Sequence, residues 1–189
     1  MALPRSHQAA YTPSEIEFLA GEEDIIIIPT HSMPKLQFIS GSFGPFRPPL
    51  KAKVPLWLAL MLKKHHMCNI LSPEWLSVDN LKKMLNDEET VAEFSPLPFH
   101  YMEISMMLLE SASEDIPNSE QVRRYLKDLR ETRQSKARAG LAVLDDRYLG
   151  MNNLSLMEIN EIRPFFSRAF LEMRKLNAEE SNNYSQPPA

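Results

Sequence analysis

The 189-residue chain is poor in cysteine, in glycine and in long apolar runs. Its one cysteine, Cys68, cannot form a disulfide within the chain, which is unlike the usage of a small secreted domain. The longest uncharged apolar run, 54–62, has nine residues, against roughly 20 for a membrane helix. The first 15 residues also lack the apolar segment of a signal peptide. We therefore expect a soluble intracellular protein without a membrane span.

The chain also has no excess of positive charge. Twenty-five Asp and Glu against 21 Lys and Arg give a net charge of −4. Strong binding to naked nucleic acid usually needs the opposite sign, so this balance disfavours it unless a local basic surface exists. A hydrophobic content of 43% excludes collagen-like and wholly disordered classes. A chain of this length buries enough surface to fold without a metal or a disulfide.

Proline and glycine are concentrated near the N-terminus. Eight of 15 prolines lie in the first 55 residues, and three of five glycines lie in the first 44. Within this part, Ser14 and Glu17 match a helix-capping box. The β-branched run 24–29 predicts a buried strand, 35–40 predicts a second strand, and 41–49 reads as a connector. We predict a small β-rich domain over residues 1–50.

After residue 50 the apolar pattern takes the helical period. A second capping box, Ser155 to Glu158, opens the last predicted helix. The fold class is thus mainly α: a small N-terminal β-rich domain, an α-helical bundle domain with long helices over 51–180, and a disordered tail over 181–189. The predicted helical segments are 56–64, 73–76, 79–90, 99–112, 119–148 and 155–176.

No constellation of residues indicates catalysis or metal binding. The sequence His65-His66-x-Cys68 has no second pair of ligands at zinc spacing, so the histidines are interpreted as the end of a surface helix. Cys68 has no recognisable base and is interpreted as a small buried hydrophobe. Carboxylates such as Asp87, Glu88 and Glu89 occupy a run that we interpret as exposed. We expect no catalytic residue, no cofactor and no metal site.

A basic stripe runs from Arg123 to Arg138. It holds seven basic and two acidic residues, a local net charge of +5. Three interpretations remain: a solvated helix face, an interface to an acidic protein partner, or a phosphate-binding surface. Arg133 and Lys136 stand where the apolar stripe of Leu126 and Leu129 would have continued.

Geometry favours a protein partner. The predicted helix over 119–148 would be about 42 Å long, whereas a domain of this size is about 36 Å across if its radius of gyration is near 14 Å. The predicted helix over 99–112 is apolar on two sides, and methionines suit adaptable interfaces. The residues predicted to form a subunit interface are Met106, Met107, Arg123, Leu126, Arg130, Arg133 and Lys136.

Several segments together resemble one family. VPLWLALMLKKHHMCNILSPEWL over 54–76 and NLSLMEIN over 153–160 resemble signature segments of the Psf-two subunits of the eukaryotic GINS complex. GPFRPPL, TRQSKAR and SEIEFLAGE, at 44–50, 132–138 and 14–22, are also similar to that family. The resemblance covers roughly residues 12–178 in the same order.

The resemblance implies a nuclear, non-catalytic structural subunit with a B domain followed by an A domain. Its implied partners are three paralogous GINS subunits, of the Sld-five, Psf-one and Psf-three types, in a heterotetramer. The tetramer would join the MCM hexamer, whose ATPase is the motor, and a further accessory protein in the CMG helicase. That assembly acts with the replicative polymerase machinery in initiation and elongation of DNA replication, with only indirect DNA contact.

On this interpretation, charge reversal at Arg133 or Lys136 should weaken assembly, because a like charge would meet an acidic partner. The alternative function is a helical nucleic-acid-binding module that uses the stripe over 123–138. It would show steeply salt-dependent binding. An enzyme is a third and weaker alternative.

Overall fold

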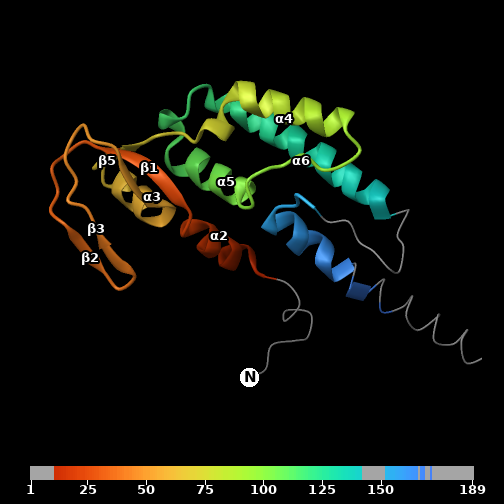
Figure 1. The fold of residues 1–189 in the computed structure, drawn as a ribbon, viewed down its shortest axis with the longest axis horizontal. Coiled ribbons are helices and arrows are strands. Elements are labelled where there is room, and N and C mark those ends of the chain that lie inside the picture. The colour runs from red at the N-terminus through yellow and green to blue at the C-terminus, as the bar shows by residue number, and fades with distance from the viewer. Residues whose placement is uncertain (1–10, 142–151, 166, 169–170, 172–189) are drawn as a thin grey trace, which may run out of the picture.

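The computed structural model describes residues 11–141, 152–165, 167, 168 and 171. Figure 1 shows a small β part joined to a larger layer of helices. The mainly helical fold with an N-terminal β part, expected from the sequence, is confirmed. The predicted tail over 181–189 and the predicted helical residues 142–148 and 172–176 lie outside the described residues.

The first described helix, α2 (Pro13–Gly21), begins earlier than predicted. Its capping box is formed by Thr12 and Glu15, not by Ser14 and Glu17. Glu15 N donates to Thr12 Oγ1 over 3.3 Å, and Thr12 N donates to Glu15 Oε2 over 2.7 Å. The reason for the difference is Pro13, which suits the first helical position because that position needs no amide donor.

A three-stranded antiparallel sheet has the strand order β4-β1-β5. The central strand β1 (Asp24–Pro29) matches the predicted strand, and it pairs with β4 (Ala52–Pro55) and β5 (Cys68–Ile70). Ile25 and Ile27 point to the buried face, where α3 (Leu56–Lys64) packs. Since β4 and β5 both follow residue 50, the sheet extends across the boundary predicted there.

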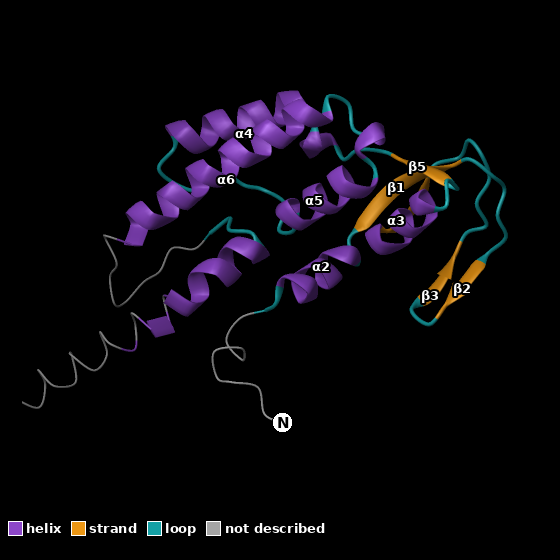
Figure 2. Cartoon of the chain, turned by 180° about the vertical axis from the view of Figure 1, so that it is seen from behind, coloured by secondary structure: helices purple, strands orange, loops and turns teal. Residues whose placement is uncertain are grey.

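A separate two-stranded ribbon projects beside the sheet (Figure 2). It consists of β2 (Leu36–Phe38) and β3 (Gly41–Phe43), so the predicted second strand exists and the predicted connector contains a short edge strand. Phe38 and Phe43 hold the ribbon against Trp57 of α3, with ring centroids 5.2 and 6.2 Å from the indole.

The helical part contains α4 (Val78–Thr90), α5 (Tyr101–Ser111) and α6 (Ser119–Leu141), with short 3₁₀ turns at Glu74–Leu76 and Ser113–Asp115. Helices α4 and α6 lie side by side, and α5 lies between them and the sheet (Figures 1 and 2). A further helix over 156–165 runs near α2, where Asn160 exchanges two hydrogen bonds with the Tyr11 backbone. One apolar cluster extends from Ile25 in the sheet to Leu129 in α6.

A buried ion pair joins the sheet to the helical part. Lys63 of α3 is 6% exposed, and its Nζ lies 2.9 Å from Asp115 Oδ1 and 2.8 Å from Glu114 Oε1. Asp115 Oδ2 also accepts a hydrogen bond from Ile70 N in β5 over 2.8 Å. Burial alone would lower the pKa of Lys63, but these two carboxylates outweigh it and raise the pKa.

Removing the Asp115 carboxylate should destabilise the chain. Asp115→Ala leaves the Ile70 amide without its acceptor and takes one counter-ion from a buried ammonium, so we expect a loss of about 2 kcal/mol in the free energy of unfolding. The matched control is Glu114→Ala, which removes the neighbouring, mostly exposed carboxylate and should cost less. Urea unfolding of both variants measures the difference, and equal losses would contradict this role for Asp115.

Candidate interaction site

Helix α6 buries a charged residue on its apolar face. Val122, Leu126 and Leu129 point inward and are buried. Arg133 follows Leu129 at the same helical spacing and is 1% exposed. The side of the polar centre of α6 that carries Arg133 is therefore covered by the chain itself.

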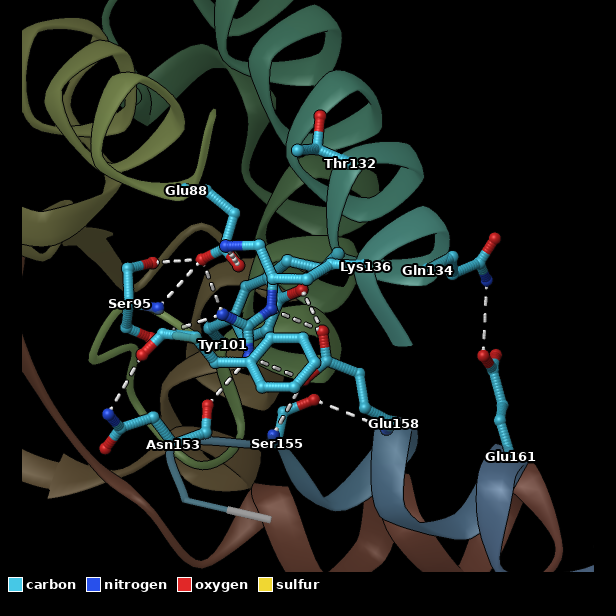
Figure 3. Close-up of polar contacts among 12 residues, drawn as sticks. Glu88, Ser95, Tyr101, Thr132, Gln134, Lys136, Asn153, Ser155, Glu158 and Glu161 are labelled. Atoms are coloured by element: carbon cyan, nitrogen blue, oxygen red, sulfur yellow. Dashed lines mark hydrogen bonds and ion pairs between the residues drawn. The ribbon is translucent and has the colours of Figure 1, made fainter. Parts of the chain in front are cut away.

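All five N–H donors of the Arg133 guanidinium are used. Their acceptors belong to Glu88, Ser95, Asn153 and Glu158, which Figure 3 shows close together. Nε and Nη2 donate to the two carboxylate oxygens of Glu158 over 2.7 and 2.9 Å. Nη1 donates to Glu88 Oε2 over 2.9 Å and to Ser95 O over 3.2 Å. Nη2 also donates to Asn153 O over 2.7 Å. One side chain thus connects α4, the loop after it, and the start of the helix over 156–165.

Glu88 of α4 is buried between two cations. Its Oε2 accepts from the amide and the hydroxyl of Ser95, and Lys136 Nζ lies 2.8 Å from its Oε1. Burial would raise the pKa of Glu88, but the hydrogen bonds from Lys136 and Ser95 and the charge of Arg133 outweigh it and hold that pKa below its usual value. Glu88 is therefore an ionised counter-ion at neutral pH.

Lys136 also closes the end of α4. Its Nζ donates to Val91 O over 2.8 Å and to Glu93 O over 3.0 Å. The last turn of α4 contains no basic residue of its own, so a cation from α6 satisfies carbonyls there. The Phe94 ring packs against both cations, at 5.0 Å from Arg133 Cζ and 5.7 Å from Lys136 Nζ.

Glu158 forms the predicted capping box. It also belongs to a buried ion cluster, which consists of Arg133, Lys136, Glu88 and Glu158. Ser155 N donates to its Oε2 over 2.8 Å, and Glu158 N donates to Ser155 Oγ over 3.4 Å, so this prediction is confirmed. Tyr101 Oη donates to Glu158 Oε1 over 3.1 Å. Burial opposes ionisation of Glu158, but its bonds with Arg133 and Ser155 keep the pKa low. Burial raises the pKa of Tyr101, which therefore stays a donor.

The structure changes the role of two residues predicted at a subunit interface. Arg133 and Lys136 were expected to meet an acidic partner, but their acids are Glu88 and Glu158 of the same chain. Reversal of either charge would therefore act first on the fold, because it would place like charges together inside the chain.

The other predicted interface residues are divided between surface and interior. Leu126 is buried, and Met107 is partly buried against the apolar cluster. Arg123 reaches back to α5, where Nη2 donates to Leu109 O over 2.6 Å. Arg130 pairs with Glu161 on the surface over 2.7 Å. Met106 is 52% exposed on α5.

Glu88 is the residue that the sequence interpretation placed wrongly. It was interpreted as part of an exposed acidic run, but it is 1% exposed. Its position seven residues after Leu81 puts it on the same inner face of α4. This spacing could have predicted that Glu88 faces inward. Its charge argued for an exposed position instead.

The structure agrees with the sequence interpretation of the histidines as a surface helix end and of the cysteine as a small buried hydrophobe. His65 and His66 are exposed. Cys68 is buried, and burial raises the pKa of its thiol to about 11, which makes it a poor nucleophile at neutral pH. Within the described ranges, no group of three potential metal ligands occurs and no helix is long and apolar enough to cross a membrane.

One further carboxylate is buried without a counter-ion. Glu103 of α5 is 1% exposed, and its oxygens accept no well-formed hydrogen bond within the described residues, although the amides of Glu103 and Met157 lie near enough to favour its ionised form. Burial is the main cause that raises the pKa of Glu103, and the negative charge of Glu158 adds to it. Ionisation of Glu103 is therefore unfavourable in the folded chain.

Comparison with known proteins matches both parts of the chain. A model described as the PSF2 N-terminal domain matches residues 12–71, and one described as the GINS complex protein helical bundle domain matches residues 75–181. The protein named DNA replication complex GINS protein psf2 of Schizosaccharomyces pombe is 45% identical over 93% of this chain and 96% of its own length. The proteins named DNA replication complex GINS protein PSF2 of Candida albicans and Homo sapiens are 42% and 40% identical, over 93% and 86% of this chain and 88% and 90% of their own lengths.

Loss of the Arg133 charge should destabilise the fold strongly. Arg133→Met leaves Glu88 and Glu158 as buried acids without their shared cation, which typically costs about 3–5 kcal/mol in the free energy of unfolding. The same substitution at Arg130, in an exposed pair on the same helix, should cost no more than about 1 kcal/mol. Urea unfolding of the two variants tests this, and similar losses would show that the buried cluster is not needed.

Neutralising Glu103 should stabilise the chain in a pH-dependent way. Because the folded pKa lies above its ordinary value of 4.5, ionisation opposes folding. Glu103→Gln should therefore raise the free energy of unfolding at pH 7, by about 1 kcal/mol. The gain should disappear as the pH falls through the folded pKa toward 4.5. Glu110→Gln, on the exposed side of the same helix, is the control, and a Glu103→Gln effect that does not change with pH would contradict the argument.

Proposed function

This chain belongs to the PSF2 family of GINS complex proteins, and from that membership we propose that it is a structural, non-catalytic subunit of a GINS heterotetramer acting in DNA replication. The observation that carries the proposal is the pair of family matches, which together span residues 12–71 and 75–181. Both family domains are therefore present. The N-terminal domain precedes the helical bundle domain, and together they cover most of the chain.

In this proposal the other three members of the tetramer are GINS subunits of the Sld-five, Psf-one and Psf-three types. The assembled tetramer joins the MCM hexamer and its accessory protein in the CMG helicase, inside the nucleus. The chain supplies a rigid shape and binding surfaces, while the ATPase belongs to the motor. Contact with DNA and with the replicative polymerase machinery is made through the larger assembly.

We propose that the two structural units meet near residues 72–74. The β5 strand ends at Ile70, the first family match ends at residue 71, and the second begins at residue 75. The Lys63–Asp115 ion pair then crosses between the units. The continuous apolar cluster supports their acting as one rigid body in the assembly.

Exposed apolar side chains support a protein-binding role for the outer faces of α2 and α5, which pack against each other. Phe18 is 73% exposed on α2, and Leu19 beside it is 41% exposed. Met106 of α5 is 52% exposed, so it remains our proposed contact residue. Arg123 and Arg130 stay at the surface, where they can form the polar rim of such an interface.

The nucleic-acid alternative loses support from the placement of the basic stripe. Arg133 and Lys136 are neutralised within the chain by Glu88 and Glu158. Arg130 pairs with Glu161, which likewise lies outside the stripe. The charge available for phosphate groups is therefore much smaller than the +5 that the sequence indicates.

Co-expression with the three presumed partner subunits tests the proposal. We expect one complex with one copy of each subunit, measured as mass during size-exclusion chromatography. Met106→Glu should reduce recovery of the complex by about tenfold, because a charge would enter an apolar contact. Met67→Glu, at a methionine 40% exposed in the β part, is the control.

Failure of the unaltered chain to join the complex would overturn the proposed function. Full assembly of the Met106→Glu variant would overturn only the proposed surface, because the unaltered chain would still assemble.

A further inference from the structure

A pocket of about 200 Å³ lies where the β part meets the helical part. It is lined by residues from the α2–β1 junction, the start of α3, the 3₁₀ turn at Glu74–Leu76 and the start of α5. We propose that this pocket receives the side chain of an arginine presented by a protein partner. The pocket lies outside the ion cluster and apart from the exposed side chains of α2 and α5 described above.

The floor and walls of the pocket are apolar and aromatic. Ile25 and Leu56 are buried and form apolar lining. Trp75 and Phe99 add two aromatic rings, and Phe99 is 48% exposed. The Phe99 ring meets the His100 imidazole edge-on, with centroids 4.9 Å apart and planes at 73°. Aromatic faces attract a cation, and a planar guanidinium can also stack on them.

The polar side of the pocket contains a carboxylate, Glu23, that can accept further hydrogen bonds. Glu23 is half exposed, and the one basic side chain within 4.0 Å that the described residues give it is His100, whose Nε2 lies at that limit from Glu23 Oε1. The neighbouring lining residue Asp24 is already paired with Lys53 over 2.8 Å. Glu23 is therefore the carboxylate that can accept a new charged donor.

His100 adds a second polar group to the pocket lining. Its side chain is only 10% exposed, and its Nε2 is the ring nitrogen on the side of Glu23. A polar side chain that enters this pocket would bring a donor group next to an imidazole and a carboxylate.

Size and shape select the ligand. Small-molecule sites usually have volumes of about 300–1,000 Å³, so this pocket suits one long side chain. Arginine fits better than lysine because its guanidinium can stack on an aromatic ring and bond to a carboxylate at the same time. The two structural units both line the pocket, so a bound arginine would also bridge them.

The test uses the full chain labelled with 5-fluorotryptophan. The chain has two tryptophans, and Trp75 lines the pocket while Trp57 packs against Phe38 in the ribbon contact. The probe is N-acetylarginine methylamide, followed by ¹⁹F NMR. N-acetylcitrulline methylamide is the matched probe, since it has nearly the same shape without the charge. Glu23→Gln and Glu22→Gln are the matched variants, because Glu22 lies next to Glu23 but outside the pocket lining.

We expect the Trp75 signal to move saturably with the arginine probe while the Trp57 signal stays in place. Citrulline should bind about tenfold more weakly. Glu23→Gln should reduce arginine binding to the citrulline level, and Glu22→Gln should leave it unchanged. The absence of a saturable Trp75 shift, equal binding of the two probes, or equal behaviour of the two variants would overturn the proposal.

Discussion

The fold of the helical part depends on one buried guanidinium. A charged group inside a protein is costly unless every donor finds an acceptor, and Arg133 satisfies this condition with acceptors from distant segments. Glu88 lies 45 residues before it, and Glu158 lies 25 residues after it. The end of α4, the loop that carries Ser95 and the first turn of the helix over 156–165 must therefore occupy fixed positions around α6. Apolar contacts alone would tolerate small shifts of these elements, whereas five directed hydrogen bonds tolerate much less.

The same device recurs at the junction with the sheet. Lys63 is buried, and Asp115 both neutralises it and accepts a bond from the edge strand β5. Two inward-facing cations thus attach the outer segments of the chain to α3 and α6. Because these tethers are internal, apolar side chains such as Phe18 and Met106 can remain on outer faces without being needed for the fold of the chain itself. That division suits the proposed role of the chain as a structural subunit.

Sequence patterns were sufficient for the class of fold, the central strand β1 and the capping box at Ser155, because each depends on residues close together in the chain. They were insufficient for the ion cluster. The spacing from Leu129 to Arg133 and from Leu81 to Glu88 continues the inner faces of α6 and α4, but charged residue types argue for the surface when the partner is unknown. Only the packing of two helices shows that these charges meet. The pocket beside His100 was likewise invisible, since its lining comes from four separate segments without a shared motif.

The ion cluster and the pocket are connected through one backbone contact. Leu156 N, in the first turn that Glu158 caps, donates to Phe99 O over 3.0 Å. Arg133 holds Glu158, Glu158 holds that turn, and the turn holds the residue that provides an aromatic wall of the pocket. A change in the position of the helix over 156–165 would therefore move Phe99 relative to Glu23, because Glu23 belongs to the α2–β1 junction and not to the helical part. The geometry of the pocket thus depends on a charge buried in a different part of the chain.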